Sequence, residues 1–255
     1  MSEKVESTKF IGEEFKTNNS GICYIVEYTS GKEVAVEFED GFRTTAQMSN
    51  IRRGRVRNPF HQNNKLYGFG VTDEKGSSNS SRCKIYRVWE SMITRAYSEK
   101  YHKKYPSYKN VEVDIRWERF SEFRKSVSNF VGYDEVLNNG WVLDKDILVK
   151  GNKTYSPETC CFVPPEINGL VVRTSKRNNL PLGVHFCKRQ NLYVSQMSVG
   201  NSMKHLGYFD CPDKAHETYL LAKKDHMRFI ADNWRGKIDP RVYEALIDWT
   251  VEIND

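Results

Sequence analysis

One stretch of the sequence, from Leu143 to Asn168, gathers the residue types best suited to chemistry: LDKDILVKGNKTYSPETCCFVPPEIN. Asp144 and Asp146 flank Lys145, and the stretch ends on Asn168. Carboxylate and amide oxygens are ligands that Mg²⁺ accepts in proteins, and hydrolysis at a phosphate also needs a group that activates water. The residue types therefore fit a divalent-metal centre at Asp144 and Asn168.

The elements around these residues must bring them together. The letters WVLD predict a strand that ends at Asp144, the pair Gly-Asn predicts a turn, and CCFV predicts a returning strand. Pro165 then suits the first position of a helix whose first turn holds Asn168. Two strands and a helix joined in this way bring Asp144 close to Asn168, and the helix N-terminus adds partial positive charge.

The same letters also fit a loop with a purely structural role. Asp144 and Asp146 are common turn residues, and Ser156 followed by proline is a usual helix start. Asn168 followed by Gly169 is a usual helix end. The spacing alone leaves both interpretations open.

The composition is that of a folded protein. The chain has 255 residues, of which 38% are hydrophobic and 13% aromatic. Its apolar runs are too short to span a bilayer, and the segment MSEKVESTKF lacks the apolar core of a signal peptide. We therefore expect a soluble, cytoplasmic protein with no membrane partner. The six cysteines show no C-x-x-C spacing, which favours reduced, mostly buried thiols over a zinc site.

Positive charge is gathered in two clusters. The net charge is +6, and no acidic residue lies between Glu166 and Asp210. That segment holds six basic residues: Arg173, Lys176, Arg177, Lys188, Arg189 and Lys204. The second cluster lies in IRRGRVR and consists of Arg52, Arg53, Arg55 and Arg57. One such cluster alone is as well explained by a solvated face, whereas two of them favour contacts with a nucleic-acid backbone.

The N-terminal part predicts a small antiparallel sheet. The runs GICYIVEY, EVAVEFED and FRTTAQM alternate apolar and polar residues, and Asn-Ser-Gly, Ser-Gly-Lys and Asp-Gly turn signals separate the runs. We expect an SH3-like β-barrel, or a curled sheet of that size, over 1–60. The polar sequence over 61–81, rich in Gly, Ser and Asn, then predicts a linker.

Two amphipathic helices are predicted after the linker. One runs from about Ile85 to Tyr97, with its start at Ser80 or Ser81, and the other begins near Arg116. Their aromatic and aliphatic residues recur at helical spacing, which indicates a packed core rather than a cofactor site. We expect these helices to form the scaffold for the acidic stretch.

The C-terminal part predicts a three-stranded sheet followed by helices. Short strands are expected at about 182–187, 192–198 and 203–209. Cys211 with Pro212, and Asp239 with Pro240, each predict the start of a helix. The predicted fold class is therefore α+β.

The span from Trp89 to Asn168 resembles the HNH (ββα-metal) endonuclease modules of phages and group I introns. The letters WESMITRAY are similar to the W-x-x-M-x-x-R opening of such modules, and Asp144, followed by a Gly-Asn turn, matches their metal-binding Asp. Asn168 follows Thr159 by nine residues (168 − 159 = 9), as the last Asn of the family follows its middle Asn. The resemblance implies a module over 82–175 in which Asp144 and Asn168 bind Mg²⁺ or another divalent cation.

Two positions depart from this family. Lys145 stands where the family has its general-base His, and Thr159 stands where it has the middle Asn, which holds the loop. A lysine with its ordinary pKa of about 10.4 is protonated at neutral pH, so Lys145 suits a phosphate contact better than the activation of water. Asp146 is the other candidate base, and strand alternation would direct it towards Asp144 and away from Lys145.

The segment LGVHFCKRQNLYVSQMSVGNSMKHLGYFDCPDKAHETYLLAKK resembles the APETALA2-like DNA-binding domains found fused to phage and homing HNH endonucleases. It has the Gly-Val opening of that family, the Tyr of the second strand, Leu-Gly-x-Phe at the end of the third, and an Ala-containing helix. The resemblance implies a domain over 176–255 whose sheet enters the major groove. The implied DNA contacts are Lys188, Arg189, Gln190, Tyr193, Ser195, Gln196 and Lys204, with His185 and His205 as surface or packing residues.

These features together predict a site-specific DNA endonuclease of phage or homing type, which hydrolyses phosphodiesters of double-stranded DNA with a divalent metal. Its expected location is the cytoplasm of an infected bacterial host. The alternative is a catalytically inactive protein derived from an HNH nuclease, which binds DNA or engages a host or phage protein. The departures at Lys145 and Thr159 keep this alternative open.

Overall fold

A computed structural model of the protein describes residues 10–74, 83–171, 180–200 and 202–249. The chain divides into two compact units, Met1–Arg124 and Lys125–Asp255, and both contain helices and strands. The predicted α+β class is therefore confirmed. The finer division at residues 60, 81 and 175 stays a prediction.

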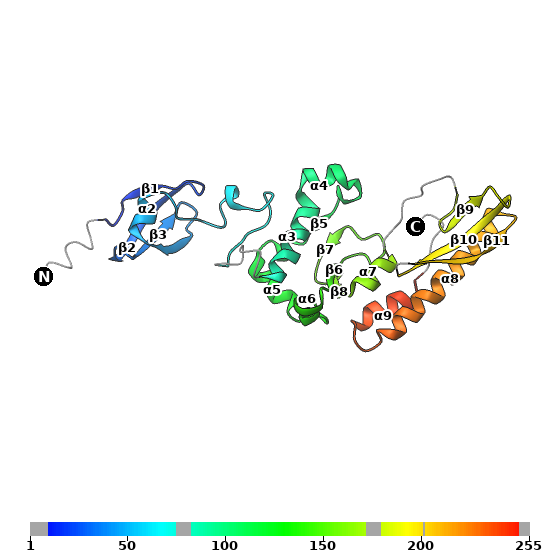
Figure 1. The fold of residues 1–255 in the computed structure, drawn as a ribbon. Helices are drawn as coiled ribbons and strands as arrows, with labels where there is room; N and C mark the ends of the chain where they lie inside the picture. Colours follow the sequence, from blue (N-terminus) through cyan, green and yellow to red (C-terminus); the bar gives the residue numbers. More distant parts are fainter. Residues whose placement is uncertain (1–9, 75–82, 172–179, 201, 250–255) are drawn as a thin grey trace. The chain divides into compact units, whose positions relative to one another are not determined.

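The first unit opens with a four-stranded antiparallel sheet (Figure 1). Its strands, in the order in which they are paired, are β1 (Glu14–Lys16), β2 (Ile22–Ser30), β3 (Glu33–Phe38) and β4 (Arg43–Ala46). The short helix α2 (Met48–Arg52) follows β4. Within the described residues β1 pairs only with β2 and β4 only with β3, so the sheet is open, in place of the predicted closed barrel. With only three residues, β1 is too short to close it.

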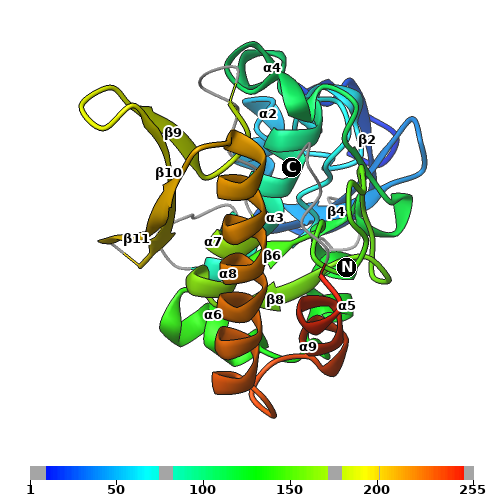
Figure 2. The same ribbon diagram turned by 90° about the vertical axis from the view of Figure 1, so that its right-hand side faces the viewer.

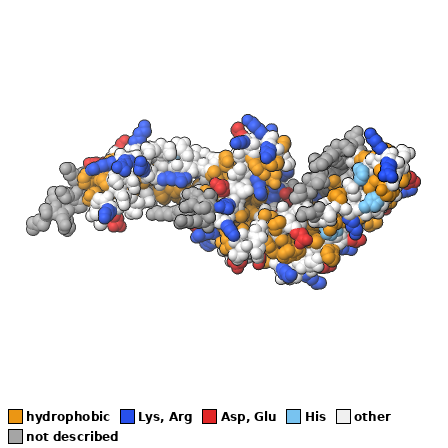
Figure 3. All heavy atoms as spheres, viewed as in Figure 1, with side chains coloured by type: hydrophobic (Ala, Val, Ile, Leu, Met, Phe, Trp, Pro, Cys, Tyr) orange, Lys and Arg blue, Asp and Glu red, His pale blue; other side chains and the backbone are white. Residues whose placement is uncertain are grey.

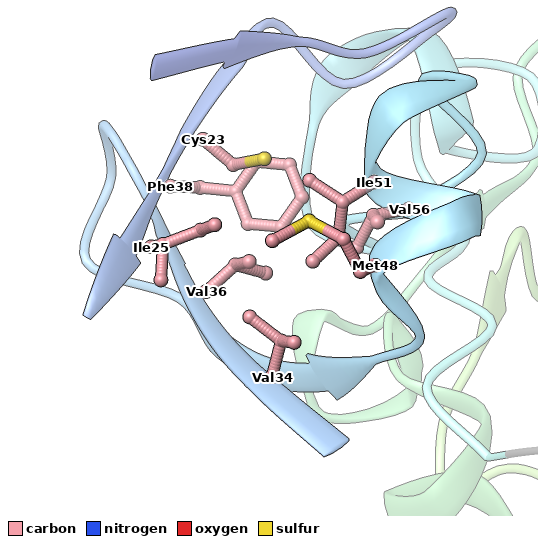
Figure 4. Close-up of a cluster of buried hydrophobic side chains, with 8 residues drawn as sticks. All are labelled: Cys23, Ile25, Val34, Val36, Phe38, Met48, Ile51 and Val56. Carbon is pink, nitrogen blue, oxygen red and sulfur yellow. The ribbon is translucent and has the colours of Figure 1, made fainter. Parts of the chain in front are cut away.

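Alternating side chains of β2 and β3 build the core under this sheet (Figure 4). Every second residue of a strand points to the same face, which places the apolar residues of both strands towards α2. The buried cluster consists of Cys23, Ile25, Val34, Val36, Phe38, Met48, Ile51 and Val56. The alternation that predicted these strands is therefore the pattern that forms their core.

The described part of the predicted linker, 61–74, makes specific contacts. It contains the 3₁₀ turn η1 (Gln62–Asn64) and a buried Val71, whose backbone N–H donates to the carbonyl of Glu118 at 2.8 Å. Lys65 also pairs with Glu118, at 2.7 Å between Nζ and Oε1. Residues 61–74 are therefore packed in spite of their polar composition. Residues 75–81 of the predicted linker lie outside the described residues.

The rest of the first unit is helical around a cluster of aromatic side chains. Its elements are α3 (Lys84–Tyr97), α4 (Glu99–Lys104), η2 (Pro106–Tyr108), β5 (Glu112–Val113), η3 (Ile115–Trp117) and α5 (Phe120–Val127), which continues into the second unit. Helix α3 is capped by Cys83 rather than by the predicted serines. The second predicted helix begins at Phe120, because the 3₁₀ turn η3 contains Arg116 and its two neighbours. Trp89 and Trp117 are fully buried, and Trp89 Nε1 donates to the carbonyl of Trp117 at 2.8 Å.

The second unit contains the acidic stretch and the C-terminal sheet. The elements around the acidic stretch are α6 (Tyr133–Asn139), β6 (Val142–Asp144), β7 (Thr154–Tyr155), β8 (Cys161–Val163) and α7 (Pro165–Val171). Strands β6 and β8 are antiparallel, and α7 contacts β6. The predicted order of strand, strand and helix is confirmed.

The C-terminal sheet is antiparallel, with the order β11-β10-β9. Its strands are β9 (Val184–Cys187), β10 (Leu192–Val199) and β11 (Ser202–Phe209), close to the predicted ranges. Helix α8 (Pro212–Asn233) contacts all three strands, and α9 (Pro240–Ile247) packs against α8 (Figure 2). Among the described residues, no helix combines the length and the apolar character needed to cross a membrane.

Candidate functional site

The two predicted metal ligands lie on elements that are in contact. Asp144 is the last residue of β6 and pairs with Cys161 of β8. Helix α7 follows β8 after Pro164 and contacts β6. Asn168 lies in the first turn of α7, where its backbone N–H donates to the carbonyl of Pro164 at 3.1 Å. Its half-buried side chain makes no hydrogen bond within the described residues.

Only one of the two carboxylate oxygens of Asp144 takes part in the turn. Its Oδ1 accepts the backbone N–H groups of Asp146 and Ile147, both at 2.7 Å. Its Oδ2 accepts no hydrogen bond from the part of the chain that the structure describes. The residue is only 9% exposed, and this burial raises the pKa of the carboxyl above its ordinary value, partly offset by the two backbone hydrogen bonds. Asp144 thus has the predicted turn role and keeps one oxygen for a ligand.

Two substitutions at Asp144 separate its turn role from its charge. Asparagine keeps an oxygen acceptor for the two N–H groups and removes a buried charge, so Asp144→Asn is expected to be at least as stable as the wild type at neutral pH. Alanine leaves both N–H groups without an acceptor, so Asp144→Ala is expected to lose about 1–3 kcal/mol of unfolding free energy. Urea denaturation measures both values, and equal loss in the two variants would contradict the turn role.

The raised pKa also fixes the sign of a pH dependence. Folded Asp144 holds its proton more tightly than the unfolded chain does, so its contribution to stability falls as the pH rises from the ordinary value of 3.8 through the raised folded value. Asp144→Asn removes this contribution. The free energy of unfolding of Asp144→Asn minus that of the wild type is therefore expected to grow over that pH range and then to level off.

Lys145 is turned into the loop and not towards solvent. It is 5% exposed, and its Nζ donates to Oδ1 and Oδ2 of Asp146 at 2.7 and 2.8 Å and to the carbonyl of Asn152 at 2.8 Å. An ammonium group has three N–H donors, so all of them are used. Lys145 therefore closes the loop, in place of the predicted contact with a scissile phosphate.

The prediction for the direction of Asp146 is also corrected. Its carboxylate pairs with Lys145 instead of pointing towards Asp144. The reason is that β6 ends at Asp144, so the alternation of a strand does not extend to the next two residues. The side chain of Asp146 is 43% exposed, and both of its carboxylate oxygens accept hydrogen bonds from Nζ of Lys145.

Asn152 and Thr159 complete the closed loop. The amide of Asn152 donates to the carbonyls of Lys145 and Thr154, at 2.8 and 2.7 Å, and its Oδ1 accepts the N–H of Thr154 at 3.0 Å. Thr159 Oγ1 donates to the carbonyl of Thr154 at 2.8 Å. Thr159 therefore holds the loop through backbone contacts.

The cysteines next to the site do not form a metal centre. Cys160 and Cys161 are buried and free, and burial raises the pKa of the Cys160 thiol to about 12. Within the described ranges, no three or more His, Cys, Asp or Glu side chains are grouped so that they could hold a metal. An ion at this site would therefore depend on Asp144, Asn168 and water.

The register of the C-terminal sheet divides its side chains between two faces. Residues directly opposite each other on neighbouring strands point to the same side. Val184, Ser195 and Gly207 are opposite one another, and Ser195 is 0% exposed on the side covered by α8. Ser195 thus cannot reach DNA, which corrects its predicted role.

Two further predicted contacts lie on the side of α8. Tyr193 is opposite Phe186 and Phe209, in the row next to Ser195 on the same face, and its ring is 5.2 Å from that of Phe186. Lys204 is opposite the buried Met197. Burial lowers the pKa of His226 on α8, and the charges of Lys223 and Lys204 lower it further. Neither side chain belongs to the open face of the sheet.

The open face carries Gln196, which was predicted, and several side chains that were not. Gln196 is opposite His205, and Val194 is opposite His185 and Tyr208. The rings of His205 and Tyr208 are 4.6 Å apart. The pairing of β10 with β11 contains a bulge opposite Ser195 and Gln196. Simple alternation along β11 places His205 and Tyr208 on opposite faces, whereas the pairing places them on the same face.

The turn between β9 and β10 presents three predicted contacts to solvent. Lys188, Arg189 and Gln190 are exposed, and the backbone N–H of Gln190 donates to the carbonyl of Cys187 at 3.2 Å. Lys188 and Arg189 form no ion pair with any described residue. Arg173, Lys176 and Arg177 lie outside the described residues.

The N-terminal arginines stand on a fixed backbone. Arg52, Arg53, Arg55 and Arg57 are exposed, whereas Ile51, Gly54, Val56 and Asn58 between and beside them are buried. Gly54 has a φ of +64°, and a Cβ there would lie 2.8 Å from Oδ1 of Asn18. Arg57 donates to the carbonyl of Asn64 at 3.1 Å. Lys and Arg side chains are visible over this sheet in Figure 3.

We found no family model that matches the chain, and no curated protein or solved structure that is significantly similar to it. The function is therefore inferred from the side chains of the chain itself.

Proposed function

We propose that this protein binds duplex DNA and that its C-terminal sheet is the surface that reads it. One observation carries the proposal: the open face of the sheet presents hydrogen-bonding side chains beside a turn with two cations, Lys188 and Arg189, that pair with no described residue. No acidic residue lies anywhere in the three strands or their turns. Phosphates are held by such cations, and bases are read by polar side chains on a strand or helix in the major groove.

The resemblances support the same function. A likeness to APETALA2-like domains in the C-terminal segment, and to HNH modules in the acidic stretch, suits a protein of phage or mobile-element origin that acts on DNA. The N-terminal sheet, with its SH3-like size, would add backbone contacts through its arginines. These finer assignments are part of the proposal.

A metal-dependent endonuclease is the second candidate, and Asp144 favours it. Its Oδ2 and the amide of Asn168, which form no hydrogen bond within the described ranges, lie on elements in contact and fit two ligands of a divalent ion such as Mg²⁺. Such an ion, when bound, would polarise a phosphate oxygen and lower the pKa of a water. The residues do not provide the base of the HNH family, because Lys145 and Asp146 are paired with each other.

The two candidates are separated by one experiment. The full-length protein and Asp144→Ala are each incubated with linear duplex DNA and Mg²⁺ or Mn²⁺, and binding and cleavage are measured together. We expect both proteins to bind equally and neither to cut. Cleavage by the wild type that disappears in Asp144→Ala would establish the endonuclease instead, and binding by neither protein would refute both candidates.

The N-terminal arginines give a testable contribution to DNA binding. Replacing Arg52, Arg53 and Arg55 with alanine is expected to lower the slope of log K against log salt by about 2.7, since each lost phosphate contact removes about 0.9. A matched triple variant at the exposed Lys100, Lys103 and Lys104 of α4 removes the same charge. An equal change of slope in both triple variants would show a general charge effect and contradict specific contacts.

A further inference from the structure

The open face of the C-terminal sheet contains no Lys, Arg, Asp or Glu among its described residues. By register and alternation its members are His185, Cys187, Leu192, Val194, Gln196, Ser198, Met203, His205 and Tyr208, of which Val194 is buried beneath its neighbours. Lys204 points to the other side, and the remaining cations of the sheet lie in the turn after β9. The face therefore combines polar and apolar side chains, and none of its described members is permanently charged.

Several of these side chains are available to a ligand. The backbone N–H of Gln196 donates to the carbonyl of Gly183 at 2.9 Å, which fixes the strand. Its side-chain amide makes no hydrogen bond within the described part of the chain, so both its donor and its acceptor are free. Tyr208 is 47% exposed, and Met203 is 58% exposed.

The chemistry of this face matches one class of base pair. Glutamine makes a two-point contact with adenine in the major groove, and apolar groups contact the methyl of thymine. Guanine is read mainly by Arg or Lys, and cytosine by Asp or Glu, which this face lacks. We infer that the sheet selects A·T base pairs, with Gln196 as the adenine reader and Met203 and Tyr208 against thymine methyl groups. This inference depends on the proposed binding of duplex DNA.

A single strand stacked on the aromatic rings is the competing ligand, and the ring geometry disfavours it. Stacking platforms need open ring faces. The rings of His205 and Tyr208 lie 4.6 Å apart with their planes tilted by 54°, so each ring covers part of the other. The aromatic pair of Phe186 and Tyr193 lies on the opposite side of the sheet.

The test compares the affinity of the full-length protein for two duplexes of equal length at one salt concentration. One duplex has a core of mixed A·T steps, and the other has a core of mixed G·C steps. We expect the wild type to bind the A·T duplex about tenfold more tightly, the size of one good two-point base contact. Gln196→Ala should remove most of this ratio while its affinity for the G·C duplex stays unchanged, which also shows that the variant is folded.

Gln47→Ala is the matched control, because it removes the same group from an exposed position outside the C-terminal sheet. Its A·T to G·C ratio should equal that of the wild type. Equal wild-type affinity for both duplexes would overturn the inference and leave the proposed function intact, as would a change of ratio in Gln47→Ala alone. Tighter binding of the single strand than of either duplex would also overturn it. Binding of no DNA would refute the proposed function itself.

Discussion

Replacing Gly183 with alanine is expected to destabilise the C-terminal sheet severely. Gly183 has a φ of +77°, and a Cβ there would overlap with the ring of the buried Tyr219 on α8. The neighbouring contact, His216 Nδ1 with the carbonyl of Leu182 at 2.8 Å, holds the same segment against the helix. Backbone strain and a clash with a buried ring together should cost about 3 kcal/mol or more of unfolding free energy.

Gly200→Ala is the matched control for this prediction. Gly200 also has a positive φ, +56°, but among the described residues no atom beyond its chain neighbours lies within 4 Å of the Cβ it would gain. Only the left-handed backbone then disfavours alanine, which costs about 1–2 kcal/mol. Chemical denaturation of both variants measures the difference. If the two substitutions lower stability equally, the close packing of Gly183 on Tyr219 is refuted.

A double substitution in the turn after β9 has the largest expected effect on DNA binding. Lys188→Ala together with Arg189→Ala removes two exposed cations that no described residue neutralises. Duplex affinity should fall about 10- to 100-fold, because each charge-assisted contact contributes about 1.5 kcal/mol or less at an exposed site. The salt slope should fall by about 1.8, two contacts at about 0.9 each. Fluorescence anisotropy over a series of salt concentrations measures both quantities.

The control variant loses the same two positive charges, but from a different surface. Lys224 and Arg228 are exposed on α8, which covers the other face of the sheet. Alanine at both positions should leave the affinity within about twofold of the wild type. If the loss of affinity is the same for both pairs, then the turn makes no specific phosphate contact.

The sequence predicted most elements of this fold because its local patterns are strong. Alternation gave the strands of the N-terminal sheet, and the same residues, such as Ile25 and Val36, are found in its core. The prolines at positions 165, 212 and 240 each lie at the first residue of a helix. These features depend on neighbours within a few residues, which the sequence contains directly.

The wrong predictions concern features that depend on contacts between residues distant in the sequence or on irregular strand pairing. The bulge between β10 and β11 changes which side chains share a face, and only the partner strand determines its place. The expectation that Lys145 lies near a phosphate rests on its charge and on its position in the HNH-like stretch, whereas its three acceptors come from the folding of the loop onto Asp146 and Asn152. Closure of the barrel likewise depends on strands that are far apart in the sequence.

One contact near the candidate site had no signal in the sequence. Arg241, at the start of α9, donates to the carbonyl of Glu158 at 3.4 Å across 83 residues. Its guanidinium is also paired with Asp239 at 2.7 Å, which raises the pKa of Arg241. Helix α9 is therefore attached to the loop that precedes β8, and no motif at either position indicates this.

Amide hydrogen exchange of the full-length protein, measured with and without saturating duplex DNA, tests the proposed DNA-reading surface most directly. Bound DNA should slow exchange in the turn over 188–191 and along β11, and leave the exposed side of α8 unchanged. Exchange that slows only in other segments, while 188–191 and β11 exchange as in the free protein, would contradict the assignment of the C-terminal sheet as the surface that reads DNA.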